Sequence, residues 1–123
     1  MTRSPEHAAR AKLAALVDPY RSNAERDWAR LGALILSDEF GEAVLLTLYE
    51  PIRLSIPGGH YTPDFLHILE DGRTLFVEVK GSKKQKGYRD ARSKLRAAAE
   101  IFNFWTFAEA RGGGEEWVLE VVE

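Results

Sequence analysis

The sequence predicts a single α/β domain in which a mixed β-sheet is flanked by helices. Apolar residues recur at helical spacing in three separate segments, and short runs of β-branched and aromatic residues lie between and after them. The chain of 123 residues is long enough to bury one real core, so one domain spanning 1–123 is expected. The expected order of elements is α-α-β-β-β-α-β-β.

Two helices are expected in the first third of the chain. Residues 4–17 form the first, because Ser4 can cap it and Pro5 suits its first turn. This helix is a possible dimerisation or docking element. Residues 22–36 form the second, with Trp28 on its buried stripe.

Three strands are expected next. Residues 43–49 form a β-rich run that residues 53–56 continue after Pro51, which indicates a bend or an edge position. The segment 57–59 predicts a turn into a central hairpin within 61–81.

The last third contains one helix and two strands. A polar, basic loop over 81–87 leads into a helix over 88–102. The apolar segment 103–108 predicts a buried strand, the glycines at 112–114 a flexible turn, and residues 117–122 a final strand.

The turn of the central hairpin decides which side chains share a face. Glu78 and Lys80 lie on one face, because side chains alternate along a strand. A two-residue turn would place Asp64 opposite Val79, on the other face. A three-residue turn over 70–72, with the glycine left-handed, places Asp64 directly opposite Glu78. We expect the three-residue turn.

That register would bring two carboxylates and an ammonium together. Directly opposed residues have Cβ atoms roughly 4.5–5.5 Å apart, so Asp64 and Glu78 could share one cation. Hard divalent cations prefer oxygen ligands, which points to Mg²⁺, with Mn²⁺ as a substitute. Lys80 would hold the attacking water and contact phosphate. The alternative is that Glu78 and Lys80 are an exposed pair on an edge strand.

These residues resemble a known family. Pro63-Asp64 followed by Glu78-Val79-Lys80 resembles the motif of the PD-(D/E)XK nuclease superfamily. The longer sequences YTPDFL at 61–66 and FVEVKG at 76–81 are similar to those of the Holliday junction-resolving endonucleases of bacteriophages. The resemblance implies a restriction-endonuclease-like fold and Mg²⁺-dependent cleavage that leaves 5′-phosphate and 3′-hydroxyl ends. It also implies metal binding by Asp64, Glu78 and the Val79 carbonyl, and a homodimer for a resolvase.

Glu25 has two interpretations. Ser22-x-x-Glu25 is a capping box, in which Glu25 would bond back to the Ser22 backbone. By the resemblance, Glu25 instead points into the site as a further metal ligand or a catalytic acid that positions water. The two roles can hold in different metal states.

The charge distribution predicts a nucleic-acid partner. The net charge is −2, but residues 80–96 hold eight basic residues and only one acid. A solvated lysine-rich loop is the plainer interpretation. We expect contacts with branched or double-stranded DNA from Lys83, Lys84, Lys86, Arg89, Arg92 and Arg96.

The amino-acid composition limits the kinds of metal site and the cellular location that we expect. The absence of cysteine excludes disulfides and thiolate metal sites and predicts a cytoplasmic protein of a bacterium or a phage-infected cell. No apolar run is long enough to span a membrane.

A DNA endonuclease that resolves junctions is the leading hypothesis. A nuclease for transposon ends, restriction sites or replication intermediates is the second, and a non-catalytic DNA-binding subunit the third.

Overall fold

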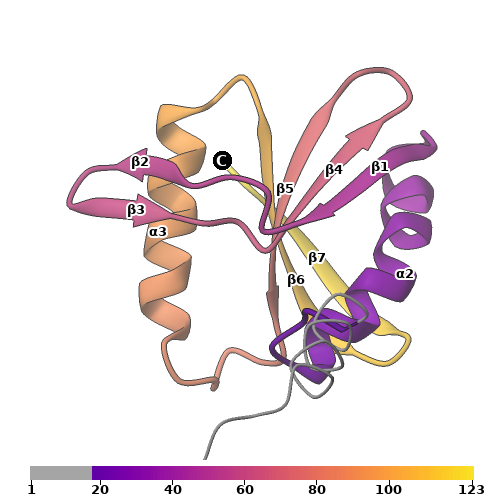
Figure 1. Cartoon of the computed structure of the whole chain (residues 1–123), viewed down its shortest axis with the longest axis horizontal. Coiled ribbons are helices and arrows are strands. Elements are labelled where there is room, and N and C mark those ends of the chain that lie inside the picture. The colour runs from indigo at the N-terminus through magenta and orange to yellow at the C-terminus, as the bar shows by residue number, and fades with distance from the viewer. Residues whose placement is uncertain (1–17) are drawn as a thin grey trace, which may run out of the picture.

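The computed structural model describes residues 18–123, and the helix expected over 4–17 lies outside them. Figure 1 shows the arrangement of the elements. In chain order these are α2 (Asn23–Phe40), β1 (Val44–Tyr49), β2 (Leu54–Ile56), β3 (Gly59–Tyr61), β4 (Phe65–Leu69), β5 (Thr74–Lys80), α3 (Tyr88–Ile101), β6 (Thr106–Gly113) and β7 (Glu116–Val122).

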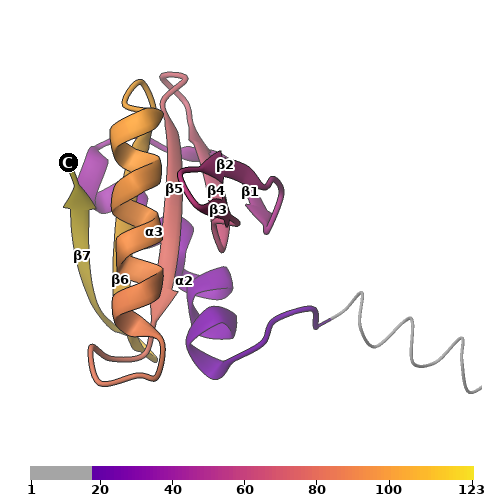
Figure 2. The same ribbon diagram turned by 90° about the vertical axis from the view of Figure 1, so that its left-hand side faces the viewer.

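The predicted mixed α/β fold is confirmed. The main sheet has five strands in the order β1-β4-β5-β6-β7, and β5 and β6 are parallel while the other neighbours are antiparallel. Helix α2 lies on one face of this sheet and α3 on the other (Figures 1 and 2). Neither helix combines the length and the apolar character that a membrane crossing requires.

Each face of the sheet has its own core, because side chains alternate along β5. The core beneath α2 is built on Trp28, Leu36, Phe65, Leu69, Leu75, Val77, Val79 and Ala110. The core beneath α3 is built on Leu54, Tyr61, Phe76, Leu95, Ala98, Ala99, Phe107 and Val122. Polar residues that share the α3 face with Phe76 therefore lie at the end of a core rather than on an open surface.

Helix α2 is longer than predicted. It begins as expected at Ser22, whose hydroxyl accepts a hydrogen bond from the Glu25 N–H at 3.1 Å. It continues to Phe40 rather than ending near residue 36. Gly41 ends it in the left-handed conformation at φ 71°, and its N–H donates to the Ser37 carbonyl at 3.0 Å.

The prediction of one bent strand over 43–49 and 53–56 was wrong. The chain turns sharply at Glu50, which has a φ of 44°, and Pro51 cannot continue a ladder. Strand β2 therefore leaves the main sheet and pairs with β3, and the turn at 57–59 closes this separate hairpin. The hairpin packs beside α3 (Figure 2).

The three-residue turn of the central hairpin is confirmed. The Leu69 N–H donates to the Arg73 carbonyl, and Gly72 adopts a φ of 91°. Leu66 pairs with Phe76 in the resulting register. The same register continued by two residues puts Asp64, directly before β4, opposite Glu78.

The C-terminal elements agree with the prediction except at one boundary. Helix α3 spans Tyr88–Ile101, and Leu95 and Ala98 are buried as expected. The strand predicted over 103–108 begins only at Thr106, and Phe104 is 72% exposed rather than buried. Strand β6 then continues through Gly113, so two of the three glycines expected in a turn belong to the strand.

Candidate active site

The C-terminal end of β5 and the N-terminal ends of α2 and α3 meet at one end of the molecule (Figure 1). A cleft with a volume of about 690 Å³ opens there. Helix N-termini favour anions such as phosphate groups. The charged residues that line the cleft are balanced between acids and bases: Glu25, Asp64, Glu78, Asp90, Arg21, Arg53, Lys80 and Lys94.

Asp64, Glu78 and Lys80 lie together in this cleft. The Lys80 ammonium is 3.2 Å from Glu78 Oε1, and both side chains are largely buried. The Val79 N–H donates to Asp64 Oδ2 at 2.8 Å, which ties the start of β4 to β5. The interpretation of Glu78 and Lys80 as an exposed surface pair was therefore wrong, because the pair lies inside the protein.

Burial and mutual repulsion change the proton affinity of the two acids. Burial, followed by the charge of Glu78, raises the pKa of Asp64 from 3.8 to about 8. Burial also raises the pKa of Glu78, although hydrogen bonds from Tyr61 and Lys80 act against that rise. Below about pH 8 the folded protein therefore favours a proton on Asp64, which leaves the single charge of Glu78 to pair with Lys80.

Tyrosine hydroxyls orient two of the acids. Tyr61 donates to Glu78 Oε2 at 2.7 Å, and Tyr49 donates to Glu25 Oε1 at 2.7 Å. Burial and the acceptor Glu78 raise the pKa of Tyr61 far above its ordinary value, so this phenol stays a donor. The sequence prediction missed both tyrosines. Their strands are visible in the sequence, but their acceptors are not, because these acids come from other elements.

Glu25 caps the start of α2, although not through the predicted bond, and its side chain also lies at the cleft. It is 8% exposed and lines the cleft, and its Oε1 accepts from the Arg21 N–H at 2.8 Å. The predicted bond to the Ser22 backbone was wrong, because the chain turns one residue earlier. Glu25 therefore holds the chain in place at the N-terminal end of α2, and its side chain also lines the cleft.

The donor set of the cleft fits a hard divalent cation. Within residues 18–123, no group of three or more histidine, cysteine or acidic side chains is arranged to hold a metal ion. Mg²⁺ typically takes only one or two carboxylates, and water and phosphate oxygens complete its shell. The oxygen donors of Asp64 and Glu78 meet that requirement, and a cation bound there would replace the proton that Asp64 retains without one.

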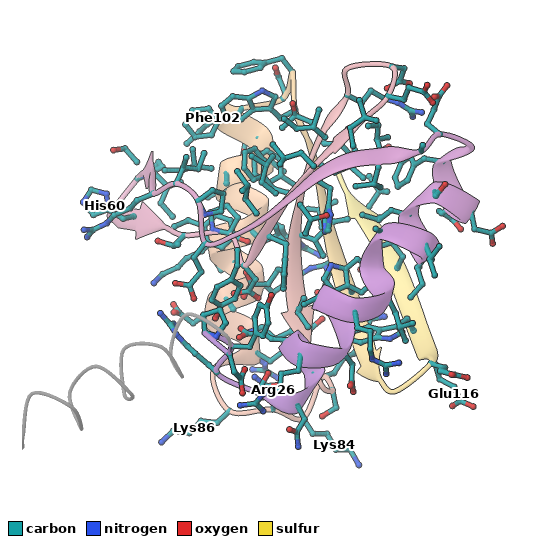
Figure 3. All side chains as sticks on the ribbon, turned by 45° about the vertical axis from the view of Figure 1, so that its right-hand side comes forward. Arg26, His60, Lys84, Lys86, Phe102 and Glu116 are labelled. Carbon is teal, nitrogen blue, oxygen red and sulfur yellow. The ribbon has the colours of Figure 1, made fainter. Side chains whose placement is uncertain are left out.

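The predicted DNA-contacting residues do not line the cleft. Lys83, Lys84 and Lys86 are exposed on the loop before α3, where Figure 3 shows Lys84 and Lys86 pointing away from the body of the protein. Arg89 and Arg96 are exposed on α3. The cleft receives Asp90, Ala91 and Lys94 from α3 instead.

The prediction that Arg92 lies on an exposed row of arginines was wrong. Its guanidinium is only 16% exposed and turns under α3 to pair with Glu109 on β6 and Glu120 on β7. Arg111 pairs with the other oxygen of Glu109 at 2.9 Å, and Tyr88 donates to Glu109 at 3.0 Å. Glu109 is 1% exposed, and although burial raises its pKa, these hydrogen bonds lower it below its ordinary value.

The sequence prediction missed Glu109 and the basic rim of the cleft. Glu109 is the cross-strand neighbour of Glu78, so the two acids share the α3 face of the sheet. The available signal was that Glu109 is the one acid in this strand and directly follows the apolar pair Phe107-Ala108. Arg53 and Lys94 belong to the rim. The spacing of Lys94 four residues after Asp90 indicates a shared helix face, but the position of Arg53 depends on the separate hairpin.

Comparison with known proteins gives little guidance. No protein-family model and no curated protein matches the chain. Among solved structures, the crystal structure of SSO0001 is similar over 96% of this chain, with a TM-score of 0.41 and 16% sequence identity. The chain spans 60% of the length of that protein.

Proposed function

We propose that the protein is a Mg²⁺-dependent DNA endonuclease whose site is formed by Asp64, Glu78 and Lys80. The observation that carries the proposal is the hairpin register, which places the two acids and the lysine in one cleft between two helix N-termini. Paired carboxylates of raised pKa with a lysine are costly to bury, and such perturbed groups gather at functional sites. The resemblance to PD-(D/E)XK nucleases rests on the same three residues.

The cation would be held by Asp64, Glu78 and the Val79 carbonyl, with Glu25 as a further acid. When bound, Mg²⁺ supplies Lewis-acid stabilisation of the phosphate and lowers the pKa of a water molecule. The Val79 N–H and the Tyr61 hydroxyl hold the two carboxylates in place. Both acids therefore keep their orientation before substrate arrives.

Lys80 provides the remaining positive charge at the site. Its ammonium, held by Glu78, can donate to the attacking water and to a phosphate oxygen. The water oxygen bonds to phosphorus as the bond from phosphorus to the 3′ oxygen breaks. The water loses its proton to solvent and the 3′ oxygen gains one, which leaves 5′-phosphate and 3′-hydroxyl ends.

The cations on the rim would hold the DNA strand. Arg53, directly before the β2–β3 hairpin, and Lys94, on α3, both line the cleft. Phosphate contacts of this kind position a strand without reading its sequence. The exposed lysines of the loop before α3 would add phosphate contacts outside the cleft.

A cleavage assay distinguishes the substrate classes. With Mg²⁺, the protein should cut a labelled four-way junction faster than the linear duplex of the same sequence. Equal rates on both would favour a nuclease for another DNA substrate. Binding without any cut in Mg²⁺ or Mn²⁺ would leave only a DNA-binding role and refute the proposed activity.

A further inference from the structure

Strand β1 forms one edge of the main sheet, and within residues 18–123 no strand pairs with its outer side. The edge is unusually apolar. Leu45, Leu46 and Leu48 are 65%, 43% and 40% exposed, and Val44–Tyr49 contains no charged residue. Exposed strand edges normally carry charges, proline or other features that prevent pairing with another chain.

The opposite edge of the sheet provides a contrast within the same molecule. Strand β7 also exposes apolar side chains, with Val118 at 57% and Val121 at 44%. It carries Glu116 and Glu120 as well. Pairing of β7 with a second β7 would bring these acids together, which disfavours association. Of the two edges that the main sheet has in residues 18–123, the β1 edge alone lacks this protection.

The hydrogen bonds of β1 determine how its outer edge could pair. The Glu50 N–H donates inward to the Asp64 carbonyl at 2.8 Å. Main-chain groups alternate in direction along an antiparallel ladder, so Leu48 and Leu46 also bond inward to β4. The N–H and carbonyl groups of Thr47 and Tyr49 therefore point outward and are available to a new strand.

We propose that this outer edge of β1 pairs with the same edge of a second copy of the chain. Self-pairing centred on Thr47 is antiparallel, matches the outward donors and acceptors, and overlaps most of the strand. It places Leu46 of one copy beside Leu48 of the other, on the face that Leu66 and Ile68 already make apolar. A two-fold axis closes this contact, so it gives dimers and not fibres.

The geometry also places the two clefts. A two-fold axis between antiparallel strands is perpendicular to the sheet, so both copies keep α3 on the same side. Glu78 and Lys80 lie on that side in each copy, but β5 runs in opposite directions in the two copies, so the two clefts lie at opposite ends of the dimer. The contact is smaller than a standard interface, which buries about 800 Å² on each partner, so we expect a reversible dimer.

Sedimentation velocity over a wide range of protein concentration tests the proposal. The mass of the wild-type protein should rise from one chain towards two, and Leu46→Glu should remain at one chain because it places an acid in the contact. Leu34→Glu is the matched control, since Leu34 is 70% exposed on α2 and should dimerise as the wild type does. A monomeric wild type at every concentration overturns the proposal, as does equal dimerisation of Leu46→Glu.

Hydrogen exchange on the wild-type protein gives a second test that needs no variant. The N–H groups of Thr47 and Tyr49 should exchange more slowly in the concentrated sample than in the dilute one. Exchange at these two positions that is independent of concentration overturns the proposal. Both tests are independent of the nuclease activity, which a monomer could still possess.

Discussion

The substitution Asp64→Asn should stabilise the protein at pH 8 in the presence of a chelator. Burial and Glu78 raise the pKa of Asp64 from 3.8 to about 8 in the folded state. Between these two pH values the unfolded chain has released a proton that the folded protein retains, so the free energy of unfolding falls as the pH rises. Asparagine is neutral and does not contribute to this loss.

The size of the effect follows from the two pKa values of Asp64. Each tenfold change in proton affinity corresponds to about 1.4 kcal/mol, so the rise from 3.8 to about 8 gives a ceiling of about 6 kcal/mol above pH 8. Asp64 and Glu78 share the penalty, so a single substitution should recover about half of it. The gain should be about 3 kcal/mol at pH 8 and near zero at pH 4.

Urea denaturation at pH 4, 6 and 8 measures the gain, followed by tryptophan fluorescence, to which the buried Trp28 contributes. Asp38→Asn is the control, because Asp38 is exposed on α2 outside the cleft. The gain of Asp64→Asn at pH 8 should exceed any effect of this control. If the stability of Asp64→Asn equals that of the wild type at all three pH values, the pKa of Asp64 is not raised in the folded protein, and burial does not penalise its charge.

Further predictions concern other groups. Saturating Mg²⁺, at a hundred times its dissociation constant, should stabilise the wild type by about 2.7 kcal/mol in thermal denaturation and Asp64→Asn much less; equal stabilisation would place the ion elsewhere. Tyr61→Phe should cost about 1–3 kcal/mol in urea denaturation, because Glu78 Oε2 loses its donor; a neutral result would contradict the contact. Arg92→Ala should cost about 3 kcal/mol, because it leaves Glu109 with one cation fewer, whereas Arg89→Ala on the exposed side of α3 should change stability by less than about 0.5 kcal/mol. The ring of His67, whose pKa burial lowers to about 4, should remain neutral from pH 7 to pH 5 by NMR; its stabilising contribution is lost as pH falls from 6.5 to 4, and protonation above pH 6 would refute this.

Local sequence signals predicted the elements near the site. The glycine of the 70–72 turn selects the register of the central hairpin, and that register alone brings Asp64 opposite Glu78. The capping serine before α2 likewise located Glu25 at a helix start. Both inferences depend on residues only a few positions apart in the chain, where local conformational preferences are strong.

Long-range contacts explain the errors. The spacing of Arg92 matches an exposed arginine row, but its buried acceptors come from β6 and β7, which the helix sequence cannot reveal. The separate β2–β3 hairpin depends on one backbone conformation at Glu50, where a positive φ is unusual for a residue other than glycine. Phe104 is apolar but exposed, because the strand begins two residues later.

Single-turnover cleavage of a labelled four-way junction, with protein in excess over DNA, tests the central claim most directly. Under these conditions weaker binding does not limit the rate, so the rate reports the chemistry of the site. Asp64→Asn and Lys80→Ala should each cut at least about a hundredfold more slowly than the wild type, while Asp38→Asn cuts at the wild-type rate. Wild-type rates from both Asp64→Asn and Lys80→Ala would show that the cleft formed by β5 is not where DNA is cut.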